Sequence, residues 1–151
     1  MSRKNLKTRE RILISAWKLL EDGKGRAVRM SDIAKEASVS RQAISLHFPN
    51  RAELLIATTR YIDEVKKVDE LLEKSRSAAT GLERLDAFIH AWGNYIPEIY
   101  GVAKALLAMK ESDQEAKLAW QDRMQAVREG CEAAVVAMKK DAVLSPKLTV
   151  K

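Results

Sequence analysis

The sequence contains few of the residues that hold proteins together through covalent bonds or metal ions. A single cysteine, Cys131, cannot form a disulfide within the chain, and the two histidines, His47 and His90, lie far apart without the spacing of metal ligands. Six glycines and three prolines in 151 residues are too few for a collagen-like or low-complexity chain. We therefore expect a globular chain with no metal site, no cofactor and no redox chemistry.

Long apolar segments are missing as well. A membrane-spanning helix needs roughly 18 consecutive apolar residues, and the longest apolar run here, Ala133–Met138, is far shorter. The basic amino terminus is followed by the polar and charged segment Thr8–Arg11, which is not the pattern of a secretory signal. The expected location is the cytoplasm, with no membrane as partner.

Positive charge is concentrated in the first part of the chain. Residues 1–60 hold 13 Lys and Arg against 6 Asp and Glu, whereas residues 61–151 hold 14 against 15. The formal net charge of +6 therefore arises entirely from the first part. Such a region favours a polyanionic partner such as DNA or RNA, and the alternative is a merely solvated surface.

The apolar pattern predicts an all-α protein. Apolar residues recur at spacings of three and four, and no alternating run rich in Val, Ile and Thr is present. Thr8 is a good N-cap, and Pro97 suits the first position of a helix. We expect helices over about residues 8–22, 30–37, 41–47, 51–72, 82–95, 97–107 and 112–138.

The segment Met30–Phe48 has the spacing of a helix-turn-helix. Two helices of about two turns are joined by a tight turn at Ser38–Ser40, and small or apolar residues occupy the packing positions. The second helix then directs a mixed set of residues outward: Arg41, Gln42, Ala43, Ser45 and His47. Among these, a glutamine amide can pair bidentately with adenine, and small residues permit close approach to a groove. The segment offers no catalytic group with a partner.

These residues resemble the tetracycline-repressor (TetR) family of bacterial transcriptional regulators. The matching segments within residues 8–60 are Thr8–Leu13, Asp32–Ala37, Val39–Ala43 and His47–Leu55. The resemblance implies an amino-terminal three-helix bundle with the helix-turn-helix, followed by a helical domain that binds an effector and dimerises. We place the DNA-binding domain at residues 1–50 and the second domain at residues 51–151. The implied function is that of a homodimeric repressor, released from a palindromic operator of double-stranded DNA by a small molecule.

The sequence departs from the family pattern at three points. Ser38 stands where the family has a glycine in a turn that often needs positive φ. Ser45 stands where the family has a tyrosine that commonly touches a backbone phosphate. Family members also generally continue with two further helices that pack against their symmetry mates, so we expect a shortened second domain here.

The resemblance assigns contacts within the DNA-binding domain. Arg41 or Gln42 would contact base edges, the backbone at Ser40 would bind phosphate, and the further candidates for phosphate contacts are His47, Arg51, Lys4 and Lys7. The alternatives are a surface charge for Arg51, a packing role for His47 and a disordered basic arm.

An effector pocket would lie among the later helices. The candidate lining is aromatic and methionine-rich: Tyr61, Phe88, Trp92, Tyr95, Tyr100, Met109, Trp120 and Met124. The alternative for each of them is ordinary core packing.

Two other functions stay open from the sequence. The first is a helical protein that binds nucleic acid without sequence preference, which would show a steep salt dependence and no operator. The second is a small helical enzyme or ligand carrier. Against the second, no paired carboxylates, Cys and His combination or Gly-rich phosphate loop can be placed together from the sequence.

Overall fold

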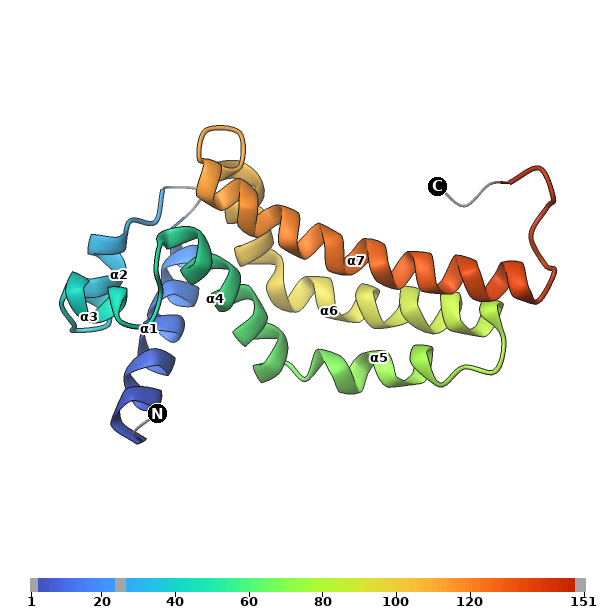
Figure 1. The fold of residues 1–151 in the computed structure, drawn as a ribbon, viewed down its shortest axis with the longest axis horizontal. Helices are drawn as coiled ribbons and strands as arrows, with labels where there is room; N and C mark the ends of the chain where they lie inside the picture. The colour runs from blue at the N-terminus through green and yellow to red at the C-terminus, as the bar shows by residue number, and fades with distance from the viewer. Residues whose placement is uncertain (1–2, 24–26, 149–151) are drawn as a thin grey trace. The chain divides into compact units, whose positions relative to one another are not determined.

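The computed structural model describes residues 3–23 and 27–148, with side chains from residue 7 onward. Over these residues the chain forms α-helices and no strand, which confirms the all-α prediction (Figure 1). The helices are α1 (Arg3–Asp22), α2 (Met30–Glu36), α3 (Arg41–Ser45), α4 (Arg51–Val65), α5 (Val68–Arg76), α6 (Gly81–Met109) and α7 (Gln114–Lys140). No helix in the described part of the chain is both long enough and apolar enough to cross a membrane.

The chain folds into two compact units, and each is built from two separate stretches of sequence. The first unit comprises Met1–Val65 and Ile99–Asp122, and the second comprises Lys66–Glu98 and Arg123–Lys151. Helices α6 and α7 therefore contribute to both units. The predicted domain boundary at residue 50 divides the chain by function, whereas the two units are defined by compactness. The boundary at residue 50 therefore stays a prediction.

The first unit has one apolar core that joins the helix-turn-helix to the ends of later helices. Amphipathic α1 packs against both α4 and α2, and α2 packs against α3, so that the apolar faces of these helices meet in one core. The carboxyl end of α6 and the start of α7 add to the same core. Its buried members include Ile12, Leu13, Ile33, Ile44, Leu54, Leu55, Leu106, Met109, Ala116 and Ala119.

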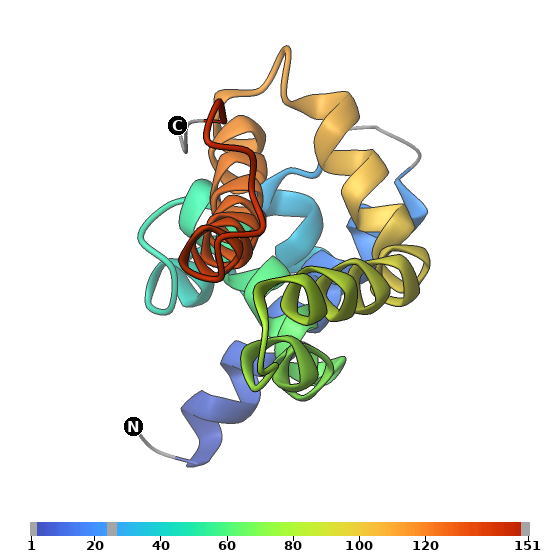
Figure 2. The same ribbon diagram turned by 90° about the vertical axis from the view of Figure 1, so that its right-hand side faces the viewer.

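In the second unit, α5, the first part of α6 and the last part of α7 run side by side (Figures 1 and 2). Glycines allow α6 and α7 to approach each other closely at two points. A Cβ atom on Gly81 would lie 2.3 Å from the backbone nitrogen of Met138, and one on Gly130 would lie 2.4 Å from the Phe88 ring. The α6–α7 pair thus has no room for a larger side chain at either position.

Three predicted helix boundaries are wrong. The helix expected over residues 51–72 is two helices, because Lys67 adopts the left-handed conformation with φ 55° and interrupts the turn. Pro97 does not begin a helix but lies inside α6, where it leaves the carbonyl of Gly93 without its usual helical donor. Finally, α1 begins at Arg3 rather than after Thr8.

Candidate nucleic-acid interface

The turn between α2 and α3 sets the direction of the second short helix. Ser38 has φ 52°, the positive value that its place in the turn predicts. The backbone N–H of Val39 donates to the carbonyl of Ala34 at 3.0 Å, and that of Ser38 donates to the carbonyl of Lys35 at 3.1 Å. These bonds close the turn immediately after α2.

Helix α3 begins with a side-chain cap and is anchored by one buried residue. The hydroxyl of Ser40 accepts a hydrogen bond from the backbone N–H of Ala43 at 3.0 Å. Ile44 is fully buried in the core of the first unit. Because one face of this single turn is fixed inward, Arg41, Gln42 and Ser45 are exposed. Ala43 is half-buried.

The other residues that we predicted to contact DNA lie in different environments. The Ser45 hydroxyl donates to the carbonyl of Arg41 at 3.2 Å, and Lys7 is exposed. His47 is half-buried against the Phe48 ring, and its Nδ1 atom is buried without a hydrogen-bond partner among the described residues. The side chain of Lys4 lies outside the described residues.

A cavity of about 300 Å³ lies beside His47 in the first unit. Its lining includes Arg9, whose guanidinium lies 5.2 Å from the centre of the Phe48 ring, and Tyr61. The Tyr61 hydroxyl donates to Glu10 at 2.9 Å, and burial together with this carboxylate raises the pKa of Tyr61. Both signs of charge line the cavity, because Glu53, Glu64 and Arg60 lie there too. This balance does not favour an anionic ligand.

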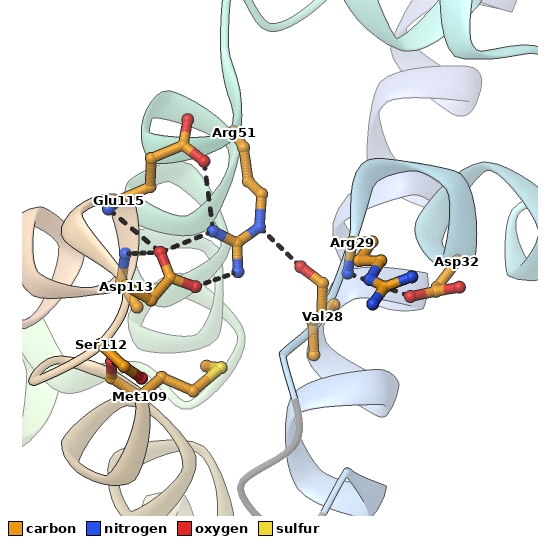
Figure 3. Close-up of polar contacts among 9 residues, drawn as sticks. Val28, Arg29, Asp32, Arg51, Met109, Ser112, Asp113 and Glu115 are labelled. Atoms are coloured by element: carbon orange, nitrogen blue, oxygen red, sulfur yellow. Dashed lines mark hydrogen bonds and ion pairs between the residues drawn. The ribbon is translucent and has the colours of Figure 1, made fainter.

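Arg51 has partners from two distant parts of the sequence (Figure 3). Its Nε donates to the carbonyl of Val28 at 2.6 Å, and its two terminal nitrogens donate to the carboxylate of Asp113 at 2.9 and 2.7 Å. The Nη1 atom also lies 3.2 Å from Glu115. Only 11% of the Arg51 side chain is exposed.

The Asp113 carboxylate also caps the start of α7. Asp113 accepts the backbone N–H groups of Glu115 and Ala116, both at 3.1 Å. The hydrogen bond from Arg51 lowers the pKa of Asp113, although burial opposes the change. Burial also opposes the charge of Arg51, but its two carboxylate partners raise its pKa overall. These contacts favour a structural role for Arg51, and its contact with phosphate stays a prediction.

The eight candidate effector residues are divided equally between the two units. Tyr61, Tyr100, Met109 and Trp120 belong to the first unit, and Phe88, Trp92, Tyr95 and Met124 belong to the second. Met109 is buried in the core, and Trp120 packs against it partly buried, whereas Tyr100 is 59% exposed and Met124 is 41% exposed.

Three of these residues form an aromatic cluster in the second unit. The Trp92 ring lies edge-on to Phe88 at 6.0 Å and to Tyr95 at 5.7 Å, measured between ring centres. The indole Nε1 of Trp92 is buried, and it has no hydrogen-bond acceptor within the described part of the chain. A buried donor without an acceptor is costly.

Sequence reasoning missed two features of this region. Leu46 is 85% exposed at the end of α3, beside Ser45. Its exposure follows from the burial of Ile44 and Phe48, which are four residues apart and occupy the inward face. The partners of Arg51 had no signal in the sequence, since Asp113 is 62 residues away.

Comparison with known proteins identifies the amino-terminal part. Residues 12–58, which extend from the middle of α1 to the middle of α4, match the family model described as bacterial regulatory proteins, tetR family. Among curated proteins, no match was found. A solved structure of a TetR family transcription regulator from Marinobacter aquaeolei VT8 is 16% identical, with a TM-score of 0.48, and the alignment covers 93% of this chain and 69% of that one. Residues 12–58 thus form an amino-terminal part that is similar to the bacterial regulatory proteins of the tetR family.

Proposed function

We propose that this protein is a DNA-binding transcriptional regulator of the tetR family, a repressor that binds a palindromic operator as a homodimer in the cytoplasm and is released by a small-molecule effector. The observation that carries the proposal is the exposed face of α3, formed by Arg41, Gln42, Ser45 and Leu46. The Ser40 cap and the buried Ile44 hold this face in one orientation. A short, rigid helix that presents an amide and a guanidinium is suited to a major groove.

Each residue of this face has a contact that suits its chemistry. The Gln42 amide can pair with the N6 and N7 atoms of adenine, and Arg41 can pair with guanine or with a phosphate. Leu46 supplies an apolar contact for a thymine methyl group, and the small Ala43 lets the helix approach closely. Lys7, Lys4 and His47 are then the candidates for phosphate contacts outside α3.

The effector site that the geometry favours is the aromatic cluster of the second unit. Phe88, Trp92 and Tyr95 provide flat apolar surface, and the Trp92 N–H provides one unsatisfied donor. A small aromatic or apolar molecule that carries a carbonyl or ether oxygen matches these groups. Release from DNA would follow if such a molecule bound better to a conformer in which the two recognition helices no longer match the half-sites.

The test is a footprint on the DNA upstream of the regulator's own gene, followed by titration of the protected fragment. We expect two protected half-sites, related by a dyad and about 34 Å apart or a multiple of that distance. Random DNA of equal length is the control. Equal affinity for both DNAs, with a steep loss in salt, would instead indicate a helical protein that binds nucleic acid without sequence preference.

Substitution of Gln42 makes the test specific to the proposed face. Gln42→Ala should lower affinity for the operator by about 10-fold to 100-fold and leave affinity for random DNA unchanged. Gln121→Ala, at an exposed glutamine of α7, is the matched control. Equal losses on both DNAs from Gln42→Ala would contradict base recognition by this residue.

A further inference from the structure

The cavity beside His47 extends along one face of α4. The residues that this helix contributes recur at helical spacing, and they are Glu53, Ile56, Ala57, Arg60, Tyr61 and Glu64. Arg9 of α1 and residues 47–49, which precede α4, complete the lining. Every lining residue belongs to the first unit, and none belongs to the aromatic cluster proposed as the effector site. The cavity is thus distinct from that cluster.

A free carboxylate stands near each end of this face. Glu53 lies in the first turn of α4 and Glu64 lies in the last turn. At about 1.5 Å per residue, their Cα atoms are roughly 16 Å apart along the helix. Both residues are exposed, and neither side chain forms a hydrogen bond or ion pair in the part of the chain that the structure describes. The cavity therefore offers two separate carboxylates to a positively charged ligand.

The two arginines of the lining already have partners within the first unit. Nη2 of Arg60 donates to Asp122 at 2.6 Å, and its Nε donates to the same carboxylate at 3.3 Å. The Arg9 guanidinium lies 5.2 Å from the centre of the Phe48 ring, within the range of a cation–π contact. An anionic ligand would compete with these contacts, whereas a cationic ligand leaves them intact.

The charge around the cavity is negative overall. The lining holds two arginines and two glutamates. Two further carboxylates bind to lining residues, Asp122 to Arg60 and Glu10 to the Tyr61 hydroxyl. This local excess of negative charge contrasts with the positive balance of residues 1–60. It favours a ligand that carries more than one positive charge.

The cavity also offers apolar surface and one hydrogen-bond acceptor. Ile56 and Ala57, which lie between the two glutamates along α4, are half-buried and supply the apolar surface. Nδ1 of His47 is buried and has no hydrogen-bond partner among the described residues. In the tautomer with its proton on Nε2, this atom accepts a hydrogen bond. An amine in the cavity would supply the missing donor.

We propose that this cavity is a second ligand site, which binds a linear diamine or polyamine. The ammonium groups at its two ends pair with Glu53 and Glu64, and its methylene chain lies against Ile56 and Ala57. One N–H group donates to Nδ1 of His47. The inference goes beyond the proposed function, because it requires neither an operator nor the aromatic cluster.

The first test is a titration of the full chain, followed by proton–nitrogen correlation NMR, with three six-carbon probes that differ in their end groups. Hexamethylenediamine carries two positive charges, hexylamine carries one, and adipate carries two negative charges. The diamine should shift the backbone signals of Ala57 and Tyr61 saturably. It should bind about 3-fold to 5-fold more tightly than hexylamine, because one further ion pair forms. The indole signal of Trp92 should stay unchanged, which separates this site from the aromatic cluster.

The second test removes the two carboxylates one at a time. Glu53→Gln and Glu64→Gln keep the size of the side chain and remove its charge, so each should lower diamine affinity about 3-fold to 5-fold. Glu132→Gln is the matched control, because Glu132 is exposed on α7 and does not line the cavity. It should bind the diamine as wild type does. Thermal unfolding checks that the three variants keep a melting temperature close to that of wild type.

The outcomes decide the inference without reference to DNA. The site is rejected if the diamine shifts no lining residue saturably, or if adipate or hexylamine binds as tightly as the diamine. It is also rejected if Glu132→Gln weakens binding as much as Glu53→Gln does. A dyad footprint would leave such a rejection unchanged, and a missing footprint would not affect a diamine bound between Glu53 and Glu64. Failure of this site and failure of the proposed function are therefore distinguishable.

Discussion

At the scale of single residues, Arg51 joins three separate groups of the first unit: the Val28 carbonyl and the carboxylates of Asp113 and Glu115. Its guanidinium satisfies one backbone carbonyl and both oxygens of Asp113, and the whole group is nearly buried. Bidentate pairing uses the planar fork of arginine, which lysine cannot reproduce. The start of α4 is thus joined to the segment before α2 and to the start of α7.

Loss of this side chain should destabilise the protein. We expect Arg51→Ala to lower the free energy of unfolding by about 2 to 3 kcal/mol, because Asp113 and the Val28 carbonyl would lose their donor. Urea unfolding followed by circular dichroism measures the change. Arg60→Ala is the matched control, since Arg60 pairs with Asp122 but is 63% exposed, and should cost less than about 1 kcal/mol. Similar losses of unfolding free energy in both variants would contradict a larger stabilising role for the buried Arg51 pair than for the exposed Arg60 pair.

The lowered pKa of Asp113 makes part of the stability depend on pH. A carboxyl whose pKa is lower in the folded protein contributes stability above its ordinary value of 3.8, and this contribution is lost as pH falls from there through the lowered value. Wild type should therefore exceed Asp113→Asn in unfolding free energy at neutral pH, and the gap should shrink below about pH 4. Urea titrations at several pH values measure it. A constant gap would show that ionisation of Asp113 is not involved.

At the scale of elements, the turn between α2 and α3 contains local backbone strain. Ser38 adopts φ 52°, a conformation that side chains other than glycine disfavour by about 1 to 2 kcal/mol. Lys67 between α4 and α5 shares this conformation at φ 55°. Both residues lie where one helix must stop before the next begins.

Ser38→Gly should raise the unfolding free energy by about 0.5 to 1 kcal/mol, because the relief of strain exceeds the added entropy of the unfolded chain. Thermal unfolding measures the gain as a higher melting temperature. Ser31→Gly is the control within α2, where glycine should destabilise by about 0.5 kcal/mol. A Ser38→Gly variant less stable than wild type would mean that the serine side chain contributes to the turn.

The elements differ in how much of them the sequence could predict. Apolar periodicity located the helix-turn-helix and the order of the helices, because each helix buries one face. It could not locate the break at Lys67, since the apolar pattern continues past one left-handed residue. Pro97 predicted a helix start, but its exposed position lets water satisfy the carbonyl it leaves unpaired. The Arg51 contacts depend on folding across 62 residues, which no local pattern contains.

At the scale of the whole molecule, the first unit is completed by chain that lies far along the sequence. Its core contains Val102, Leu106 and Met109 from α6 together with residues of α1 to α4, and all three are almost fully buried. The Arg51 contacts bring the start of α7 into the same unit. The helix-turn-helix is therefore part of a larger compact unit rather than an isolated bundle.

This shared core predicts that a mutation in α6 reduces DNA binding through stability alone. Leu106→Ala should lower the unfolding free energy by about 2 to 4 kcal/mol through the lost contacts and the cavity it leaves. Leu118→Ala is the control, because Leu118 is 42% exposed on α7, and it should cost less than about 1 kcal/mol. The two variants are compared by urea unfolding and by operator binding at rising temperature. If the α1–α4 part folded on its own, Leu106→Ala would not change the temperature at which operator binding is lost. With the core shared, that temperature should fall together with the melting temperature, while affinity in the cold stays as in wild type.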